Sequence, residues 1–145
     1  MTDDGQIMTL VERFYADAWN RWDDRVVDEI LTADFVFRGS LGDRAQGRDG
    51  FRSYRDKVHA AFPDFRNEVR ELVTDGERAA VRLNCSGRHG GELFGIAATG
   101  LTVSYDAAAF LRARAAQLCE VWVLGDLEHL RSQLSPPGSG GSRSA

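Results

Sequence analysis

The sequence predicts an α+β fold: a cone-shaped barrel made of a curled, mostly antiparallel sheet and covered by about three N-terminal helices. Up to residue 63, apolar residues recur at helical spacing, whereas from residue 66 onward they alternate as in strands. The dipeptide Asp75-Gly76 adds a strong signal for a two-residue hairpin turn. Helices first and strands afterwards are typical of helices packed on one face of a sheet.

Each element follows from a local signal. Apolar residues share a helical face in each helix, an aspartate before such a face can cap it, and a proline ends it. The expected elements are a helix over residues 6–20, a second capped by Asp24, a strand at 35–38, a loop at 39–47, a third helix capped by Asp49 and ended by Pro63, strands at 66–74, 78–88, 101–114 and 117–125, and a helical turn that Asp126 opens. Ala115-Ala116 joins the last two strands without a sharp turn signal.

Composition predicts one globular domain. The 145 residues, 43% of them hydrophobic, suffice for a core and a cavity, so we expect a single domain over residues 1–134. Residues 135–145, rich in Ser, Gly and Pro, are expected to form a flexible tail. Apolar runs are far too short to cross a bilayer, and the acidic N-terminus lacks the pattern of a secretory signal, which favours a cytoplasmic protein that binds no membrane.

Other classes of partner are not supported by the sequence. Of the 18 basic residues, 17 are arginines, but carboxylates are scattered among them and no basic stripe for nucleic acid arises. No spacing of Cys, His, Asp or Glu indicates a metal, and no Gly-rich phosphate loop follows a strand, so we expect no cofactor. Cys85 and Cys119 are interpreted as small buried hydrophobic residues, and His59 and His129 as surface residues on helices.

Several short motifs occur together in one order: Phe14 to Trp19, Ala33-Asp34-Phe35, Ser86 to Gly95, Ala98-Thr99-Gly100, and Glu120 to Asp126 with Gln133-Leu134. Over residues 7–134 this order resembles the SnoaL-like polyketide cyclases of the nuclear-transport-factor-2-like superfamily. The resemblance implies an enzyme without a cofactor, acting on an apolar small-molecule substrate, and a homodimer.

The resemblance also implies roles for single residues. Asp126, four residues after the strand tryptophan, matches the family's general acid/base, and His89 matches a motif histidine. Arg38 and Arg112 stand where aldol-type members carry Asn and His, which departs from the aldol pattern. From the residues alone, Asp126 is either a pocket carboxylate or the N-cap of the last helix.

Further candidates come from their positions on the expected elements. Trp122 and Glu120 share a strand face that is expected to lead into Asp126, and Arg112 on the neighbouring strand is the expected ion-pair partner of Glu120. The remaining candidates each have a binding and a structural interpretation: Tyr15 and Trp19 line the cavity mouth or pack on the sheet, His89 points into a pocket or stays exposed among glycines, and Arg38 binds a substrate carboxylate or enolate or points into solvent.

Three hypotheses for function remain open. The first is ring closure in a polyketide-type intermediate, by aldol, oxa-type or pericyclic chemistry, with Asp126 as acid/base and Arg38, Arg112 or His89 stabilising negative charge. The second is a non-catalytic binding or dimerisation module. The third is an epoxide hydrolase or ketosteroid-isomerase-like enzyme using Arg82, Asn84 and Asp126, although Asn84 stands where a second carboxylate is needed.

Overall fold

The computed structural model describes residues 2–134, so the expected tail lies outside the described residues. The helical elements are α1 (Asp4–Arg13), the π-helix η1 (Phe14–Trp19), α2 (Asp24–Ile30), α3 (Gly47–Ala61) and α4 (Leu127–Leu134). The strands are β1 (Leu31–Arg38), β2 (Arg44–Gln46), β3 (Arg66–Asp75), β4 (Arg78–Arg88), β5 (Thr102–Arg114) and β6 (Gln117–Gly125). No helix of this described part is long and apolar enough to cross a membrane.

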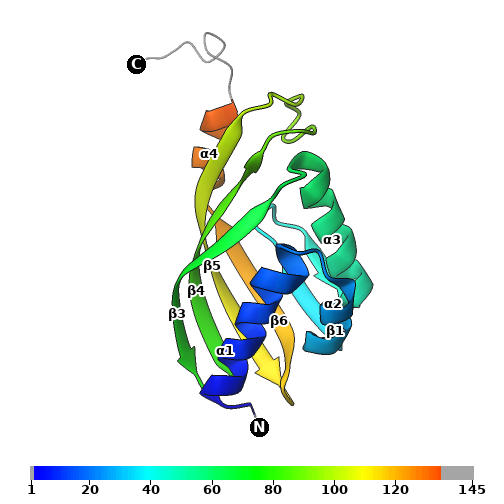
Figure 1. Cartoon of the computed structure of the whole chain (residues 1–145), viewed down its shortest axis with the longest axis vertical. Coiled ribbons are helices and arrows are strands. Elements are labelled where there is room, and N and C mark those ends of the chain that lie inside the picture. The colour runs from blue at the N-terminus through cyan, green and yellow to red at the C-terminus, as the bar shows by residue number, and fades with distance from the viewer. Residues whose placement is uncertain (1, 135–145) are drawn as a thin grey trace.

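One mixed sheet holds the strands in the order β2-β1-β6-β5-β4-β3. Only β1 and β6 pair in parallel, and the other neighbours are antiparallel. Figure 1 shows α1, α2 and α3 along one side of the curled sheet and α4 at one end of it. The α+β prediction is confirmed, but the sheet is open because β2 and β3 form two free edges.

Local differences from the prediction have physical causes. The expected first helix is divided, because residues 14–19 form wider π turns. Asp23 and not Asp24 caps α2, accepting hydrogen bonds from the N–H groups of Arg25 and Val26. The α3 helix begins at Gly47, so Asp49 lies inside its first turn and is not its cap. The expected loop at 39–47 contains the short edge strand β2.

The turn between β5 and β6 uses residues that rarely occupy its conformation. Ala115 and Ala116 both have positive φ, 51° and 65°. Two successive residues with positive φ are the pattern of a type I′ hairpin turn, which Asn and Gly adopt more readily. The Ala116 N–H donates to the Thr2 hydroxyl at 2.9 Å, which ties this turn to the N-terminal segment. The segment that lacks a turn signal in the sequence is therefore a strained turn.

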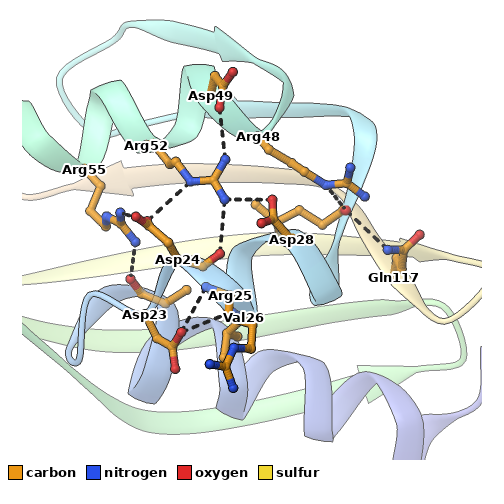
Figure 2. A network of polar contacts seen from close by, with 12 residues as sticks. Asp23, Asp24, Arg25, Val26, Asp28, Arg48, Asp49, Arg52, Arg55 and Gln117 are labelled. Atoms are coloured by element: carbon orange, nitrogen blue, oxygen red, sulfur yellow. Dashed lines mark hydrogen bonds and ion pairs between the residues drawn. The ribbon is translucent and has the colours of Figure 1, made fainter.

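An ion-pair network holds α2 against α3 (Figure 2). Arg52 on α3 donates to Asp24 and Asp28 of α2 and to Asp49 of its own helix, at 3.3, 2.7 and 3.0 Å. Arg55 is almost fully buried, pairs with Asp24, and donates to the Ala18 carbonyl at 2.9 Å. Hydrogen bonding to Arg55 lowers the pKa of Asp24. This network fixes the helical cover over the sheet.

Candidate active site

A largely apolar cavity of about 100 Å³ lies between the concave face of the sheet and the helices that cover it. This is space for several water molecules, at about 10–15 Å³ each. Its aromatic lining consists of Phe14, Tyr15, Trp19, Phe37, Tyr54, Phe62, Phe65 and Tyr105. Lys57 and Glu92 also line it and are exposed, which places the opening between α3 and the loop after β4. Concave apolar sites of this kind hold small molecules.

The π-helix presents Tyr15 and Trp19 to the cavity. Its wider turn is closed by the Asn20 N–H, which donates to the Tyr15 carbonyl at 3.0 Å. The Asn20 side chain then bonds the backbone N–H and carbonyl of Asn67 on β3, each at 2.8 Å. The segment that carries Tyr15 is thus fixed to the edge strand of the sheet. Such π turns are frequent at functional sites.

Three polar residues form a row on the concave face, which we call the polar row: Asn67, Cys85 and Tyr105. They are register partners across β3, β4 and β5. The Cys85 thiol donates to Asn67 Oδ1 at 3.3 Å. All three residues are buried and line the cavity. The sequence did carry a signal for them, because they occupy inward positions of alternating strands, but we predicted no role for any of them.

Burial keeps the acidic groups of the inner cavity protonated. It raises the pKa of Cys85 to about 12 and that of Tyr54 to about 12. It also raises the pKa of Tyr15 and of Tyr105 well above the usual value for a phenol. Near neutral pH these groups are uncharged, and the phenols offer hydroxyl protons to a ligand.

Tyr54 lines the cavity, and its hydroxyl lies close to the backbone of the segment after β1. Its hydroxyl accepts from the Leu41 N–H at 3.5 Å. A Cβ at position 39 would lie 2.0 Å from this hydroxyl oxygen, so only glycine fits there. Sequence analysis did not identify Tyr54 as a site residue, because the contact joins α3 to the end of β1.

Asp126 lies outside the cavity lining. Its side chain is exposed and accepts from the His129 N–H at 3.1 Å, which makes it the N-terminal cap of α4. Its own N–H donates to the Asp106 carbonyl at 2.9 Å. Of our two interpretations of Asp126, the geometry is that of the helix cap, because the last strand ends before it and its carboxylate is used by the first turn.

His89 is fully buried and also lies outside the cavity lining. Its Nδ1 accepts from the Thr99 N–H at 3.2 Å, and its Nε2 has no partner among the described residues. Its ring packs 5.9 Å from that of Phe62, a cavity residue. Gly91 allows this loop to approach α3, because a Cβ there would lie 2.0 Å from the Ala60 carbonyl oxygen. The histidine therefore supports the cavity wall.

The remaining strand candidates face away from the cavity. Trp122 has an exposed side chain on the outer face of the sheet, with the Arg38 guanidinium 5.1 Å above its ring. Trp122 and Glu120 share a strand face, but the residues that face inward are the alternate ones, Val121 and Val123. Arg38 donates to the Val123 carbonyl at 3.0 Å and is likewise absent from the cavity lining.

The expected pairs on these strands also differ from the structure. Arg112 and Glu120 are cross-strand neighbours, yet none of the ion pairs within residues 2–134 joins them. Arg82 pairs with Glu71 at 3.3 Å, and Asn84 donates to Asp106 at 3.3 Å, both on the outer face. The constellation of Arg82, Asn84 and Asp126 is therefore not assembled around the cavity.

His59 does not lie where the sequence analysis placed it. His59 is buried and stacks on Trp22 with ring centroids 3.9 Å apart, so its expected surface position was wrong. Its Nδ1 donates to the Arg55 carbonyl at 3.0 Å.

Among the described residues, no group of three or more His, Cys, Asp or Glu side chains could hold a metal. The absence of a cofactor stays a prediction.

The open curled sheet, its helical cover and the apolar cavity between them define a protein of the α+β class with a concave apolar pocket. The sequence profile of the SnoaL-like polyketide cyclase family matches residues 9–134, and the chain belongs to this family.

Solved structures agree with this assignment. A proposed SnoaL-like polyketide cyclase from Jannaschia sp. CCS1 is 19% identical, with a TM-score of 0.83 over 92% of this chain and 94% of that chain. A proposed polyketide cyclase from Xanthomonas campestris pv. campestris is 26% identical, with a TM-score of 0.77 over 90% and 98%. AclR from Streptomyces galilaeus, a proposed hydroxylase, is 26% identical, with a TM-score of 0.75 over 88% and 83%. The comparison with curated proteins gave no match. The family supports an enzyme of cyclase type, and the reaction is a separate question because the fold hosts several activities.

Proposed function

We propose that the chain closes a ring in a polyketide-type intermediate without a cofactor, by holding a flexible substrate in a reactive conformation. The observation that carries this proposal is the aromatic-lined cavity whose inner polar groups are neutral hydrogen-bond donors. A cavity of this kind restricts the conformations of a flexible substrate, and such restriction can lower the activation free energy substantially. Family membership supports the same conclusion.

The charge distribution favours closures that need little proton transfer at the inner wall. The groups there are phenols, a thiol and an amide, all neutral near pH 7. Their donors can stabilise negative charge that develops on a substrate oxygen. Pericyclic closure fits this environment better than an aldol step or an oxa-type addition, because each of these two moves a proton and requires a base close to the reacting group.

If a base takes part, Glu92 is better placed than Asp126. Glu92 is the carboxylate among the lining residues that the structure describes, whereas the Asp126 carboxylate caps α4. The test is a ring-closure assay with an extract of linear polyketides, in which mass spectrometry and chromatography separate linear from cyclic products. We expect Asp126→Asn, which retains a capping oxygen, to keep wild-type turnover. We expect Glu92→Gln to be slower at any step that needs a base.

Two outcomes would overturn this mechanism. If Asp126→Asn stays folded and loses most turnover, proton transfer by Asp126 is correct after all. If the wild-type chain binds polyketides and returns them unchanged, the protein is a carrier and not a cyclase.

A second proposal concerns assembly, and a specific feature of the outer face favours it. Val73, Ala80, Phe110 and Trp122 are register partners in one row across β3, β4, β5 and β6, which we call the outer row. Val73 and Phe110 are 57% and 59% exposed. A continuous exposed apolar row of this kind is typical of an interaction surface.

We propose that a second copy of the chain covers the outer row. Arg78, Arg112 and Glu120 lie in the neighbouring row, and none of the ion pairs within residues 2–134 includes them. Two copies packed face to face about a two-fold axis along the strands would bring Arg78 of each copy to Glu120 of the other. An isologous dimer requires this kind of self-complementarity.

Analytical ultracentrifugation tests the dimer. We expect the wild-type chain to sediment as a dimer and Phe110→Glu to sediment as a monomer. Met8→Glu is the matched control, because Met8 is an exposed apolar residue on α1 and not in the outer row. A wild-type monomer, or a Phe110→Glu dimer, would contradict the proposal.

A further inference from the structure

We propose that the substrate enters the cavity by an apolar end and leaves a cationic end, such as an ammonium group, in the opening beside Glu92. This inference deepens the proposed function, on which it rests, because it states the orientation and the chemical class of the substrate.

The cavity is too small for a whole polyketide-type chain. Its volume is about 100 Å³. By comparison, an apolar protein cavity of about 150 Å³ holds one molecule of benzene. A polyketide-type intermediate is larger than benzene, so only one end of it fits inside. The rest of the substrate must lie in the opening between α3 and the loop after β4.

The inner lining decides which end enters. Its polar groups include Tyr15, Cys85 and Tyr105, which are neutral near pH 7 because burial raises the pKa of each. A charged group at that depth would lose its hydration without gaining a counter-charge. The apolar end of the substrate therefore lies inside, and any charge on the substrate stays in the opening.

The opening carries a carboxylate without a partner. Lys57 and Glu92 are the charged residues among the described lining residues. Lys57 pairs with Asp43 at 2.6 Å. The exposed side chain of Glu92 takes part in no ion pair or hydrogen bond within residues 2–134. These three side chains leave one negative charge in excess, which attracts a cation and repels a carboxylate.

The backbone fixes Glu92 next to the helix that carries Lys57. The N–H groups of the two glycines before Glu92 donate to the Ala61 carbonyl, at 2.9 and 3.1 Å. A tight turn follows, in which Leu93 and Ile96 exchange two backbone hydrogen bonds at 3.0 and 2.8 Å. Glu92 lies between these two anchors, so its place at the opening does not depend on a movement of the loop.

The experiment measures, by isothermal titration calorimetry with the full chain, the affinity of three probe series: n-alkylammonium ions, n-alkanols and n-alkanoates. With chains of about four to eight carbons, each added methylene should raise the affinity about fourfold until the cavity is filled. At equal chain length, we expect the ammonium ion to bind about two- to fivefold more tightly than the alcohol, the effect of one exposed ion pair. The alkanoate should bind more weakly than the alcohol, and high salt should reduce both differences.

Three variants locate the two ends of the probe. Glu92→Gln should abolish the preference for the ammonium ion and keep the gain per methylene. Glu12→Gln is the matched control, because Glu12 is an exposed carboxylate on α1 outside the cavity lining, and it should keep the wild-type preference. Val58→Phe narrows the cavity from a half-buried position on α3 and should weaken all three series equally.

Four results would overturn the inference: an ammonium preference that survives in Glu92→Gln, an equal loss in Glu12→Gln, tighter binding of the alkanoate, or no gain per methylene. The measurement needs no turnover. A chain that shows these preferences but closes no ring keeps the site and refutes the cyclase, whereas a cyclase that binds the three series equally refutes this inference alone.

Discussion

The Tyr15 hydroxyl is expected to destabilise the ligand-free protein, and the free energy of unfolding of Tyr15→Phe measures this effect. The hydroxyl is buried and has no hydrogen-bond partner among the described residues. A buried group left unpaired costs about 1–3 kcal/mol, and a water in the cavity would recover part of this. We therefore expect the free energy of unfolding to rise by about 1 kcal/mol. For a chain of 145 residues this corresponds to a Tm increase of about 2–4 °C.

Urea unfolding followed by circular dichroism gives this free energy, and calorimetry gives the Tm. Tyr54→Phe serves as the comparison, because its hydroxyl accepts from the Leu41 N–H and the variant should lose about 0.5 kcal/mol. A loss of more than about 0.5 kcal/mol in Tyr15→Phe would show that the hydroxyl has a partner in the folded protein.

Three other changes test the fold. Ala115→Asn with Ala116→Gly should raise the free energy of unfolding by about 1 kcal/mol in urea titrations, because both residues have positive φ. Arg52→Ala should lower it by about 1–2 kcal/mol by removing its contacts with three carboxylates, and the exposed Arg21→Ala should change it by less than about 0.5 kcal/mol. Burial lowers the pKa of His59 in the folded protein. The contribution of neutral His59 to the free energy of unfolding is therefore fully present above about pH 6.5, the pKa in the unfolded chain, and is lost as the pH falls through the folded pKa. Between pH 7 and pH 5, stability should therefore fall more in the wild type than in His59→Gln.

The sequence contained enough information for most elements of the fold. The hairpin at Asp75-Gly76 was predicted almost to the residue, because a sharp turn signal separates two alternating strands. The π turns at residues 14–19 were not predicted, since the same apolar spacing fits an ordinary helix. The β2 strand was missed because three residues at a sheet edge carry almost no periodic signal.

Site prediction was limited by a different problem. Alternation shows which residues of a strand share a face, but it does not state which face is concave when both carry apolar side chains. Trp122 and Leu124 on the outer face are as apolar as Val121 and Val123 on the inner face. The choice is made by the helices that cover one side, which is a tertiary property. The placement of Trp122, Arg112 and Glu120 on the outer face follows from this.

The two faces of the sheet allow the two proposals to be separated. The polar row and Tyr15 lie on the covered face, and the outer row lies on the other, so each strand of the central sheet contributes alternate residues to both. A charge at Phe110 should break a dimer without entering the cavity, whereas Tyr15→Phe changes a cavity residue without touching the outer row. If Phe110→Glu stays folded and also loses ring closure, the cavity depends on the second copy, and the activity belongs to the dimer and not to the single chain.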